Sequence, residues 1–191
     1  MYSAITPLDG YINDEHGDFE WGAPDPESSR FINDLERGVG TYLFGRRMYE
    51  TMVYWETFDG SDDASSNELE FAEIWHSATK IVYSKTLTEV SSAKTRIERV
   101  FDPDVVRRLK EESILDISVG GANLASQAFE VGVVDEMHLF VTLLSVGGGT
   151  SAYPEHVRTR FDLADVDRFR CVFSRIVTWK MHSVMSVRRA V

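Results

Sequence analysis

Cysteine, basic residues and long apolar runs are all scarce in this sequence. Cys171 is the only cysteine among 191 residues, so the chain cannot form an internal disulfide bond. This argues against a secreted, cross-linked scaffold. The apolar runs are far shorter than the roughly 20 residues that a membrane-spanning helix needs, and no basic region precedes an apolar stretch at the N-terminus, as in a signal peptide. We therefore expect a cytoplasmic protein that does not insert into a membrane.

Acidic residues outnumber the basic ones. The chain has 20 lysines and arginines against 31 aspartates and glutamates, which gives a formal net charge of −11. This charge repels phosphodiester backbones, so nucleic acid is not an expected partner. A local cluster of arginines or a helix N-terminus can still hold a small anionic ligand on an acidic protein.

Composition and length are those of a globular protein. Hydrophobic residues make up 43% of the chain and charged residues 27%, proportions that disordered and fibrous chains do not have. The length falls within the usual range of one domain, and no linker is visible, so we expect a single domain over residues 1–191.

Several motifs of common enzymes are absent. The chain has no G-x-x-x-x-G-K-[ST] loop, no G-x-S-x-G elbow and no complete G-x-G-x-x-G dinucleotide fingerprint. The five histidines show no metal-ligand spacing, and the zinc-deaminase signature is missing. Hydrolytic and metal-dependent reactions therefore lack their usual residues, and we expect no bound metal.

Strand and helix patterns alternate along the chain. Apolar runs predict strands at residues 2–6, 39–44, 80–84, 95–100, 114–119 and 136–144. Helical spacing and start signals predict helices at residues 28–37, from 46, at 68–76, from 102 to about 112 and at 122–131. The alternation predicts an α/β fold in which helices cover both faces of a mainly parallel sheet.

The C-terminal segment has a different pattern. Residues 161–187 are predicted to form a β-hairpin, which gives the sheet an antiparallel edge because no helix separates the two strands. Apolar residues at even spacing share one face of this hairpin: Val177, Trp179, Met181, Met185 and Val187. This face either covers the core or lies exposed.

The first candidate binding site is a strand that runs into Gly45, Arg46 and Arg47. In open parallel sheets, ligands bind at the carboxyl ends of the strands. Two guanidinium groups at a helix start are unfavourable, because the positive end of the helix dipole repels them. A bound phosphate would remove this repulsion, since arginine binds phosphate through paired donors. Alternatively, both arginines pair with surface carboxylates.

Two further strand ends have similar chemistry. Gly120 and Gly121 lie between a strand and a helix, which suits a pyrophosphate but also a simple tight turn. Ser84, Lys85 and Thr86 end another strand with hydroxyl groups and a cation. They either hold a phosphate or form a solvated turn.

Six short motifs, in this order, resemble the dihydrofolate reductase-like family. They are Leu8-Asp9-Gly10-Tyr11-Ile12, Gly45-Arg46-Arg47-Met48-Tyr49-Glu50, Val82-Tyr83-Ser84-Lys85-Thr86-Leu87, Val119-Gly120-Gly121-Ala122-Asn123-Leu124, Val133-Val134-Asp135-Glu136 and Gly147-Gly148-Gly149. The branch that they resemble most contains the reductase domain of bacterial riboflavin biosynthesis. The resemblance implies a three-layer α/β/α sandwich around a mixed sheet of about eight strands, NADPH as the cofactor and a homodimer.

The resemblance also implies which residues bind NADPH. Those expected at the adenosine end and its 2′-phosphate are Gly45, Arg46, Arg47, Met48, Ser84, Lys85 and Thr86. Those expected along the pyrophosphate and nicotinamide are Val119, Gly120, Gly121, Ala122, Asn123 and Leu124, and the Gly120–Gly121 bond is often cis in relatives. Ala4 and Ile5 correspond to positions that touch the nicotinamide amide. Thr142 corresponds to a pocket-lining position, and Trp21 to a tryptophan in a mobile loop over the active site.

A proton source is harder to assign. Classical folate reductases place a carboxylate in the first helix, but this chain has none at the matching place, since Glu27 and Asp34 are shifted. Asp9 is the best remaining acid, because its loop faces the substrate in the riboflavin branch. The alternative is a turn residue that bonds its own backbone.

Two functions remain open from the sequence. The first is an NADPH-dependent reductase that transfers a hydride to a small planar heterocycle, pterin-like or aminopyrimidine-like, with the proton supplied by Asp9 or an ordered water. The second is a protein that binds NADP or another nucleotide without catalysis, which the missing helix carboxylate favours. In either case the surface of the expected dimer is the face with Trp179, Met181 and Met185.

Overall fold

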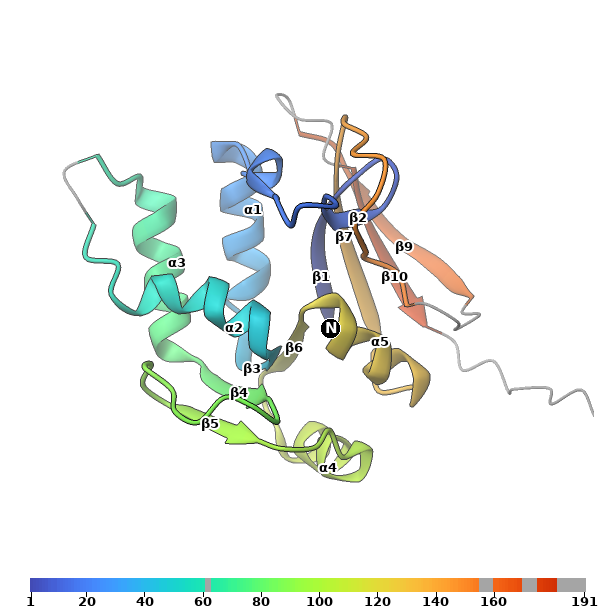
Figure 1. Cartoon of the computed structure of the whole chain (residues 1–191). Coiled ribbons are helices and arrows are strands. Elements are labelled where there is room, and N and C mark those ends of the chain that lie inside the picture. The colour runs from blue at the N-terminus through green and yellow to red at the C-terminus, as the bar shows by residue number, and fades with distance from the viewer. Residues whose placement is uncertain (61–62, 155–159, 170–174, 182–191) are drawn as a thin grey trace, which may run out of the picture.

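The computed structural model describes residues 1–60, 63–154, 160–169 and 175–181. It contains an eight-stranded sheet in the order β5-β4-β3-β6-β1-β7-β10-β9 (Figure 1). The strands are β1 (Tyr2–Pro7), β3 (Val39–Gly45), β4 (Thr79–Tyr83), β5 (Thr95–Glu98), β6 (Asp116–Gly120), β7 (Glu136–Thr142), β9 (Phe161–Asp167) and β10 (Arg175–Met181). The first six in spatial order are parallel, whereas β10 is antiparallel to β7 and to β9. The predicted mixed, mainly parallel sheet with a C-terminal antiparallel hairpin is confirmed.

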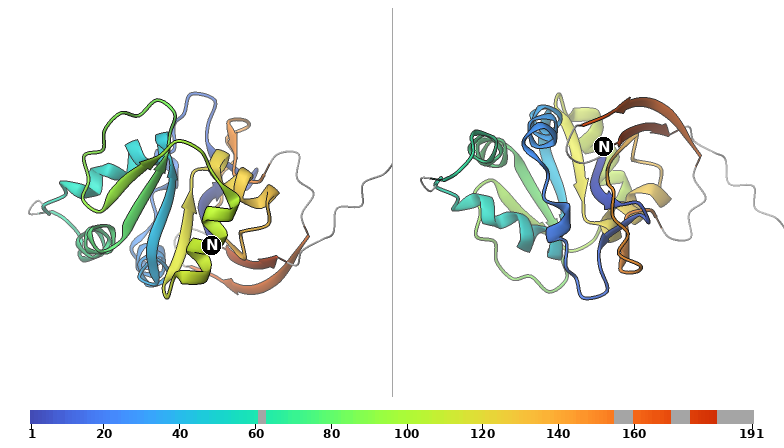
Figure 2. Two further views of the ribbon diagram at one scale, coloured as in Figure 1. Left: turned by 90° about the horizontal axis from the view of Figure 1, so that it is seen from below. Right: turned by 90° about the horizontal axis from the view of Figure 1, so that it is seen from above.

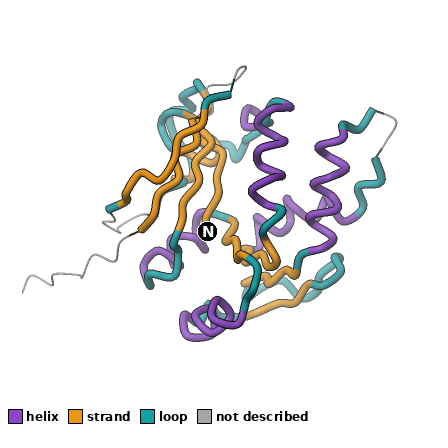
Figure 3. Tube along the Cα trace, turned by 180° about the vertical axis from the view of Figure 1, so that it is seen from behind, coloured by secondary structure: helices purple, strands orange, loops and turns teal. Residues whose placement is uncertain are grey.

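Helices flank the sheet on both faces (Figure 3). They are α1 (Pro26–Glu36), α2 (Arg46–Met52), α3 (Ser66–Ser77), α4 (Pro103–Glu112) and α5 (Ala122–Glu130), with the short 3-10 helices η1 (Glu20–Gly22) and η2 (Val53–Glu56). In the described part of the chain, none of these helices has the length and apolar character to cross a membrane.

The two hydrophobic cores explain the layers. Leu43 and Phe44 are neighbours in β3 and therefore point to opposite faces of the sheet. Leu43 belongs to the core under α4 and α5, together with Phe129 of α5. Phe44 belongs to the core under α3, where its ring stacks on Trp75 at a centroid distance of 6.0 Å. The predicted three-layer α/β/α sandwich is thus confirmed.

Helix α1 begins two residues earlier than the sequence analysis predicted. Asp25 is its N-cap, because the Asp25 carboxylate accepts hydrogen bonds from the backbone N–H groups of Glu27 and Ser28. Pro26 occupies the first helical position, where a missing N–H costs nothing. The apolar spacing alone does not reveal this start, because it first becomes regular within the helix.

Three strands are shorter than predicted, because the apolar runs continue past the residues that the sheet buries. The strand β5 ends at Glu98 rather than at residue 100, and Val100 is exposed. The strand β6 begins at Asp116 rather than at residue 114, and Ile114 is fully exposed. The strand β7 ends at Thr142 rather than at residue 144, and both Leu143 and Leu144 are exposed. Apolar character extended the prediction beyond the residues that the sheet buries.

The predicted hairpin corresponds to β9 and β10, which pair in antiparallel fashion. The positions Val177, Trp179 and Met181 alternate along β10. Met185 and Val187 lie outside the described residues.

A second, two-stranded sheet joins the loop after β1 to the glycine loop after β7. It consists of β2 (Tyr11–Asn13) and β8 (Thr150–Ser151), which are antiparallel. Seen from above in Figure 2, the two loops lie side by side. Gly149 has a φ of +134°, and a Cβ atom there would overlap the Asn13 carbonyl oxygen. The glycine loop therefore allows a backbone approach that no other residue permits.

Candidate active site

The three strand ends that the sequence singles out lie next to one another. The strands β4, β3 and β6 are adjacent and parallel, so their carboxyl ends lie at the same edge of the sheet. Gly45 at the end of β3 is opposite Tyr83 of β4, and Phe44 is opposite Gly120 of β6. Figure 1 shows α2 and α5 leaving the sheet after β3 and β6. This edge therefore presents three consecutive loops to one extended ligand.

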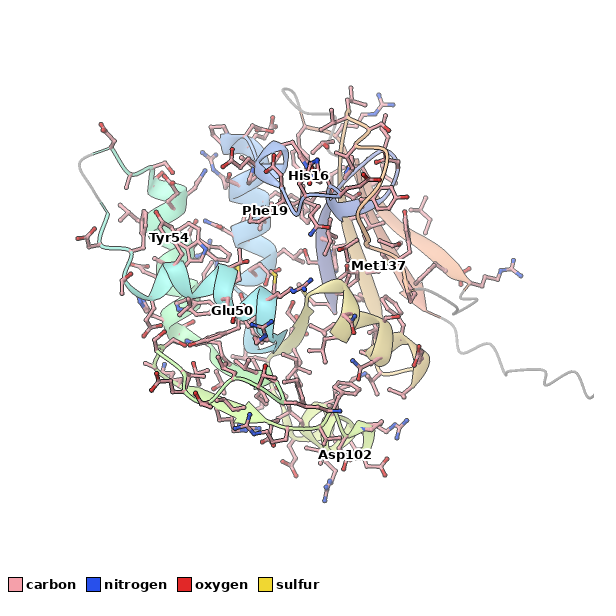
Figure 4. All side chains as sticks on the ribbon, viewed as in Figure 1. His16, Phe19, Glu50, Tyr54, Asp102 and Met137 are labelled. Carbon is pink, nitrogen blue, oxygen red and sulfur yellow. The ribbon has the colours of Figure 1, made fainter. Side chains whose placement is uncertain are left out.

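Helix α2 begins directly at this edge. Its N-cap is Gly45, whose lack of a side chain leaves the first backbone N–H groups without a side-chain acceptor, and no acidic residue occupies the first turn. Arg46 forms an ion pair of 3.0 Å with Glu50, which Figure 4 labels on α2. Arg47 is exposed and forms no ion pair with another described residue. Arg46 thus pairs with a surface carboxylate, as one of the two interpretations predicted, and Arg47 is available to an anion.

The Gly120-Gly121 turn packs tightly against α2 and β3. A Cβ atom at Gly120 would lie 2.6 Å from the Phe44 ring, and one at Gly121 would lie 3.2 Å from Cβ of Met48. Gly121 also has a φ of +92°, which favours glycine. The turn has no cis peptide bond, so the expectation taken from relatives is wrong for Gly120–Gly121. The packing explains the glycines and brings the Gly-Gly turn into contact with Met48.

Helix α5 starts immediately after this turn. Gly121 is its N-cap and supplies no side-chain acceptor, and its first turn contains no acidic residue. Ala122, Asn123 and Leu124 form the first turn of α5, and the Asn123 side chain is exposed. Val119, which precedes the turn, is buried in the core and can support the site only indirectly. Free N–H groups and the helix dipole together favour a negatively charged ligand here.

The turn after β4 is held by its own serine. The Ser84 hydroxyl accepts hydrogen bonds from the backbone N–H groups of Thr86 at 3.2 Å and Leu87 at 2.9 Å. Ser84 is buried, whereas the Lys85 and Thr86 side chains are exposed. The turn therefore has a fixed backbone that presents a cation and a hydroxyl group to solvent.

A small pocket with a cavity volume of about 10 Å³, room for about one water molecule, lies further along the sheet between β1, η1, α1 and β7. Its lining residues are Ile5, Gly22, Ala23, Pro24, Ser28, Ile32, Phe140 and Thr142. Two of them, Ile5 and Thr142, were predicted from the sequence. The Thr142 hydroxyl donates a long hydrogen bond of 3.4 Å to the Thr6 carbonyl oxygen, so it is oriented by the adjacent strand β1.

Two other predicted residues lie around this pocket. Trp21 belongs to η1, next to the pocket residue Gly22. Its Nε1 atom is buried and has no hydrogen-bond partner among the described residues, which is unusual for a buried donor. Ala4 is a neighbour of Ile5 in β1 but packs against the core under α5, on the opposite face of the sheet. The structure therefore places Ile5 in the pocket and Ala4 behind it.

Asp9 joins two loops. Its Oδ2 atom accepts hydrogen bonds from the Ser145 hydroxyl at 2.6 Å and from the Gly147 N–H at 2.8 Å. The bond from Ser145, followed by that from Gly147, holds the pKa of Asp9 below its ordinary value. The exposed carboxylate is therefore ionised at neutral pH and connects the turn after β1 to the glycine loop.

The sequence patterns did not single out Asp25, a carboxylate that is bonded to a residue of the pocket. Asp25 accepts a hydrogen bond of 2.7 Å from the hydroxyl of Ser28, which is 1% exposed and lines the pocket. Burial alone would raise the pKa of Asp25, but the hydrogen bonds from Ser28 and Glu27 outweigh it and leave the pKa below its ordinary value. The Asp25-Pro26 pair is a helix-start signal of the same kind as Asp102-Pro103, so the sequence did contain the clue.

These residues fit a reduced nicotinamide dinucleotide phosphate. Two helix N-termini without acidic residues, at α2 and α5, suit phosphate groups. Arg47 and Lys85 are exposed cations at adjacent strand ends, as a further phosphate would require. The Gly-Gly turn follows β6, and the next strands in the sheet, β1 and β7, supply Ile5 and Thr142 to the pocket.

The family model of the RibD C-terminal domain matches residues 1–173, and the chain belongs to this family. The resemblance predicted from the six motifs is thereby confirmed.

Individual relatives agree with this assignment. The chain is 28% identical over 166 residues to the uncharacterized protein YyaP of Bacillus subtilis (strain 168), a match that covers 86% of this chain and 84% of that protein. The fold of the present chain is similar to that of a protein from Shewanella sp. PV-4 that is assigned to riboflavin biosynthesis. The TM-score is 0.71, and the identity is 20% over 95% of this chain and 98% of the other. A pyrimidine reductase-like protein from Corynebacterium diphtheriae has a TM-score of 0.69 and 13% identity over 96% and 91% of the two chains.

A longer structure is also similar. It is the diaminohydroxyphosphoribosylaminopyrimidine deaminase/5-amino-6-(5-phosphoribosylamino)uracil reductase of Thermotoga maritima, with a TM-score of 0.65 and 16% identity. The match covers 95% of this chain but 56% of that one, so the present chain spans little more than half of the longer protein. At these identities the structural likenesses show a shared fold.

Proposed function

We propose that the protein is an NADPH-dependent reductase that transfers a hydride to a small planar heterocycle, with an aminopyrimidine as the first candidate. The observation that carries the proposal is the meeting of three strand ends with glycine, hydroxyl or cationic residues at one edge, beside a pocket lined by Ile5 and Thr142. The similar proteins from C. diphtheriae and T. maritima, whose names refer to pyrimidine or uracil reductases, support the substrate class.

The proposed cofactor would extend along the edge from β4 to β1. Arg47 and Lys85 would bind the 2′-phosphate, with Arg46, Ser84 and Thr86 beside them, because they belong to adjacent strand ends. Gly45 and Met48 complete this end of the site. The backbone N–H groups at the start of α5 would bind the pyrophosphate. The tight Gly-Gly turn allows a ligand to approach the backbone there without a side chain in between.

The substrate would bind over the mouth of this pocket, next to the nicotinamide. When bound, the reduced nicotinamide supplies the hydride. Ile5, Phe140 and Ile32 provide flat apolar contacts for a ring, and Thr142 provides a hydroxyl group. Trp21 would cover the ligand, and its buried Nε1–H would gain an acceptor.

The proton would come from an ordered water. Asp9 is ionised at neutral pH, because its two hydrogen bonds lower its pKa. We therefore assign it the role of orienting a water or a donor group of the substrate rather than that of the acid itself. A homodimer and a cytoplasmic location remain predictions from the sequence.

The test begins with the cofactor. Calorimetric titration of the purified protein with NADPH should give saturable binding, and NADPH should then lose its reduced-nicotinamide absorbance when aminopyrimidines or dihydropterins are added. An absence of NADPH binding would refute the proposal.

A second candidate is a protein that binds NADPH without catalysis. It is favoured by the pocket lining, which contains no carboxylate and reaches Asp25 only through Ser28. Tight NADPH binding with no oxidation by any heterocycle of the panel would select this alternative.

A further inference from the structure

We propose that Arg99 is a positioning residue that fixes the turn of residues 84–87 and thereby makes the site select NADPH over NADH. This inference rests on the proposed function and concerns a residue that neither the sequence motifs nor the expected cofactor residues include.

The geometry around Arg99 is specific. A single nitrogen of its guanidinium group, Nη1, donates hydrogen bonds to the carbonyl oxygens of Ser84 at 2.8 Å and Leu87 at 2.6 Å. These two carbonyls are the first and last of the turn. Arg99 directly follows strand β5, which pairs with β4. The carbonyl oxygen of Glu98, the last residue of β5, accepts a further hydrogen bond from the Ser84 N–H. The guanidinium group thus bridges the two ends of the turn from the neighbouring strand.

The turn is tied from inside and from outside. From inside, the Ser84 hydroxyl accepts hydrogen bonds from the backbone N–H groups of Thr86 and Leu87. From outside, Arg99 occupies the two carbonyl oxygens, which would otherwise present negative partial charge close to a bound phosphate. Between these fixed points stand Lys85, which the proposal directs at the 2′-phosphate, and Thr86 beside it. A preorganised turn spares the ligand the entropic cost of ordering it.

The charge balance points in the same direction. Arg96 on strand β5 is paired with Glu98 at 3.1 Å, and Arg46 is paired with Glu50 at 3.0 Å. Arg99 makes no ion pair with any described residue and binds only neutral carbonyl groups, so its full positive charge remains in the site. NADH lacks the 2′-phosphate that this charge would attract. Loss of Arg99 should therefore weaken NADPH binding more than NADH binding.

A purely structural role would give a different result. If Arg99 only stabilised the loop between β4 and β5, its removal would lower the unfolding temperature and weaken the two dinucleotides equally or not at all. The ratio of the dissociation constants for NADH and NADPH separates the two roles, because the nucleotides differ only in the phosphate.

The experiment measures both dissociation constants by calorimetry, together with thermal unfolding, for the wild type and three variants. Arg99→Gln removes the charge but keeps N–H donors, Arg99→Lys keeps the charge, and Arg96→Ala is the control on the preceding strand β5. We expect Arg99→Gln to weaken NADPH binding about tenfold and NADH binding less than twofold, with Arg99→Lys in between and Arg96→Ala unchanged.

The inference would be overturned if the wild type preferred NADPH and Arg99→Gln kept the same ratio of the two constants. It would also be overturned if Arg99→Gln and Arg96→Ala changed that ratio alike. A wild type that binds neither dinucleotide would refute the proposed function itself, and this inference with it.

Discussion

The hydroxyl of Ser28 lies 2.7 Å from Oδ2 of Asp25 and donates a hydrogen bond to it. Ser28 is almost completely buried and lines the pocket, whereas Asp25 caps helix α1. The negative charge of Asp25 is thereby placed directly behind the pocket wall. A substrate that presents an N–H group to Ser28 would be favoured by this charge, because hydrogen bonds that involve ionised groups are the stronger ones.

The first prediction separates the charge of Asp25 from its capping role. Asp25→Asn keeps one side-chain oxygen that can accept the cap hydrogen bonds, and asparagine caps helices as well as aspartate does, so stability should be nearly unchanged. Asp25→Ala should cost about 1 kcal/mol of unfolding free energy, because the first N–H groups of α1 lose their acceptor. Turnover of the heterocycle should fall about tenfold in Asp25→Asn, with an unchanged dissociation constant for NADPH. Full turnover in Asp25→Asn would show that the pocket does not use this charge.

The second prediction concerns the exposed cations Arg47 and Lys85, neither of which forms an ion pair with a described residue. Arg47→Ala and Lys85→Ala should each weaken NADPH binding about tenfold and leave NADH binding almost unchanged, since each removes an uncompensated charge. Calorimetric titration measures both. Arg108→Ala, an exposed arginine on α4, is the control. Unchanged NADPH affinity in Arg47→Ala and Lys85→Ala alike would contradict the proposed 2′-phosphate site.

A change at Glu50 should strengthen NADPH binding, whereas the changes at Arg47 and Lys85 should weaken it. Because Glu50 holds Arg46 in an ion pair of 3.0 Å, Glu50→Gln should release Arg46 and remove a negative charge near the site. NADPH should then bind roughly two- to fivefold more tightly, a gain in the range of exposed ion-pair energies. A salt titration supports the assignment if the gain shrinks at high ionic strength. Weaker binding in this variant would count against a role for Arg46.

How far the sequence predicts this architecture can be judged from the two Asp-Pro pairs. Asp102-Pro103 predicted the start of α4 correctly, whereas Asp25-Pro26 was passed over in favour of apolar spacing that begins later. The strand-end motifs were located correctly, because glycine and polar residues interrupt the apolar runs there. Their meeting at one edge follows from the parallel order of β4, β3 and β6, which sequence patterns do not contain.

The parts of the site that escaped prediction depend on contacts across the fold. Pro24 and Ser28 reach the pocket from around the start of α1 and Phe140 from β7, and nothing in their immediate neighbours indicates this. Arg99 binds main-chain carbonyls, which have no residue identity for a motif to specify. By contrast, Gly120 and Gly121 were predictable, because their backbones must approach other groups closely and only small side chains permit this.

The buried carboxyl group of Glu36 gives a prediction about how stability depends on pH. Glu36 accepts a hydrogen bond of 3.0 Å from the Tyr42 hydroxyl, and burial raises the pKa of Glu36 to about 7, an effect that the bond from Tyr42 partly offsets. The folded protein therefore keeps a proton that the unfolded chain loses above its ordinary pKa of 4.5. Stability should fall as the pH rises from about 4.5 to about 7, by about 3 kcal/mol, and should not fall further from this group above that range.

The control for this effect is Glu36→Gln, which has nearly the same shape and does not titrate. Chemical denaturation between about pH 5 and pH 8 should show a fall in stability for the wild type that is absent in Glu36→Gln. Glu130→Gln, an exposed position on α5, should behave as the wild type. An equally steep fall in Glu36→Gln would assign the pH dependence to another group.

The last prediction concerns the glycine loop that carries the partners of Asp9. Gly147 has a φ of +81° and no atom near a built Cβ, so Gly147→Ala should cost only the conformational penalty of about 1 kcal/mol. Gly149→Ala places a Cβ atom on the Asn13 carbonyl oxygen and must separate β2 from β8, so it should cost about 3 kcal/mol or more. Denaturant titration compares the two variants, and hydrogen exchange at Thr150, whose N–H donates to Asn13, reports on the strand pair directly. Equal losses of stability in Gly147→Ala and Gly149→Ala would show that the close approach of the two loops does not exist in solution.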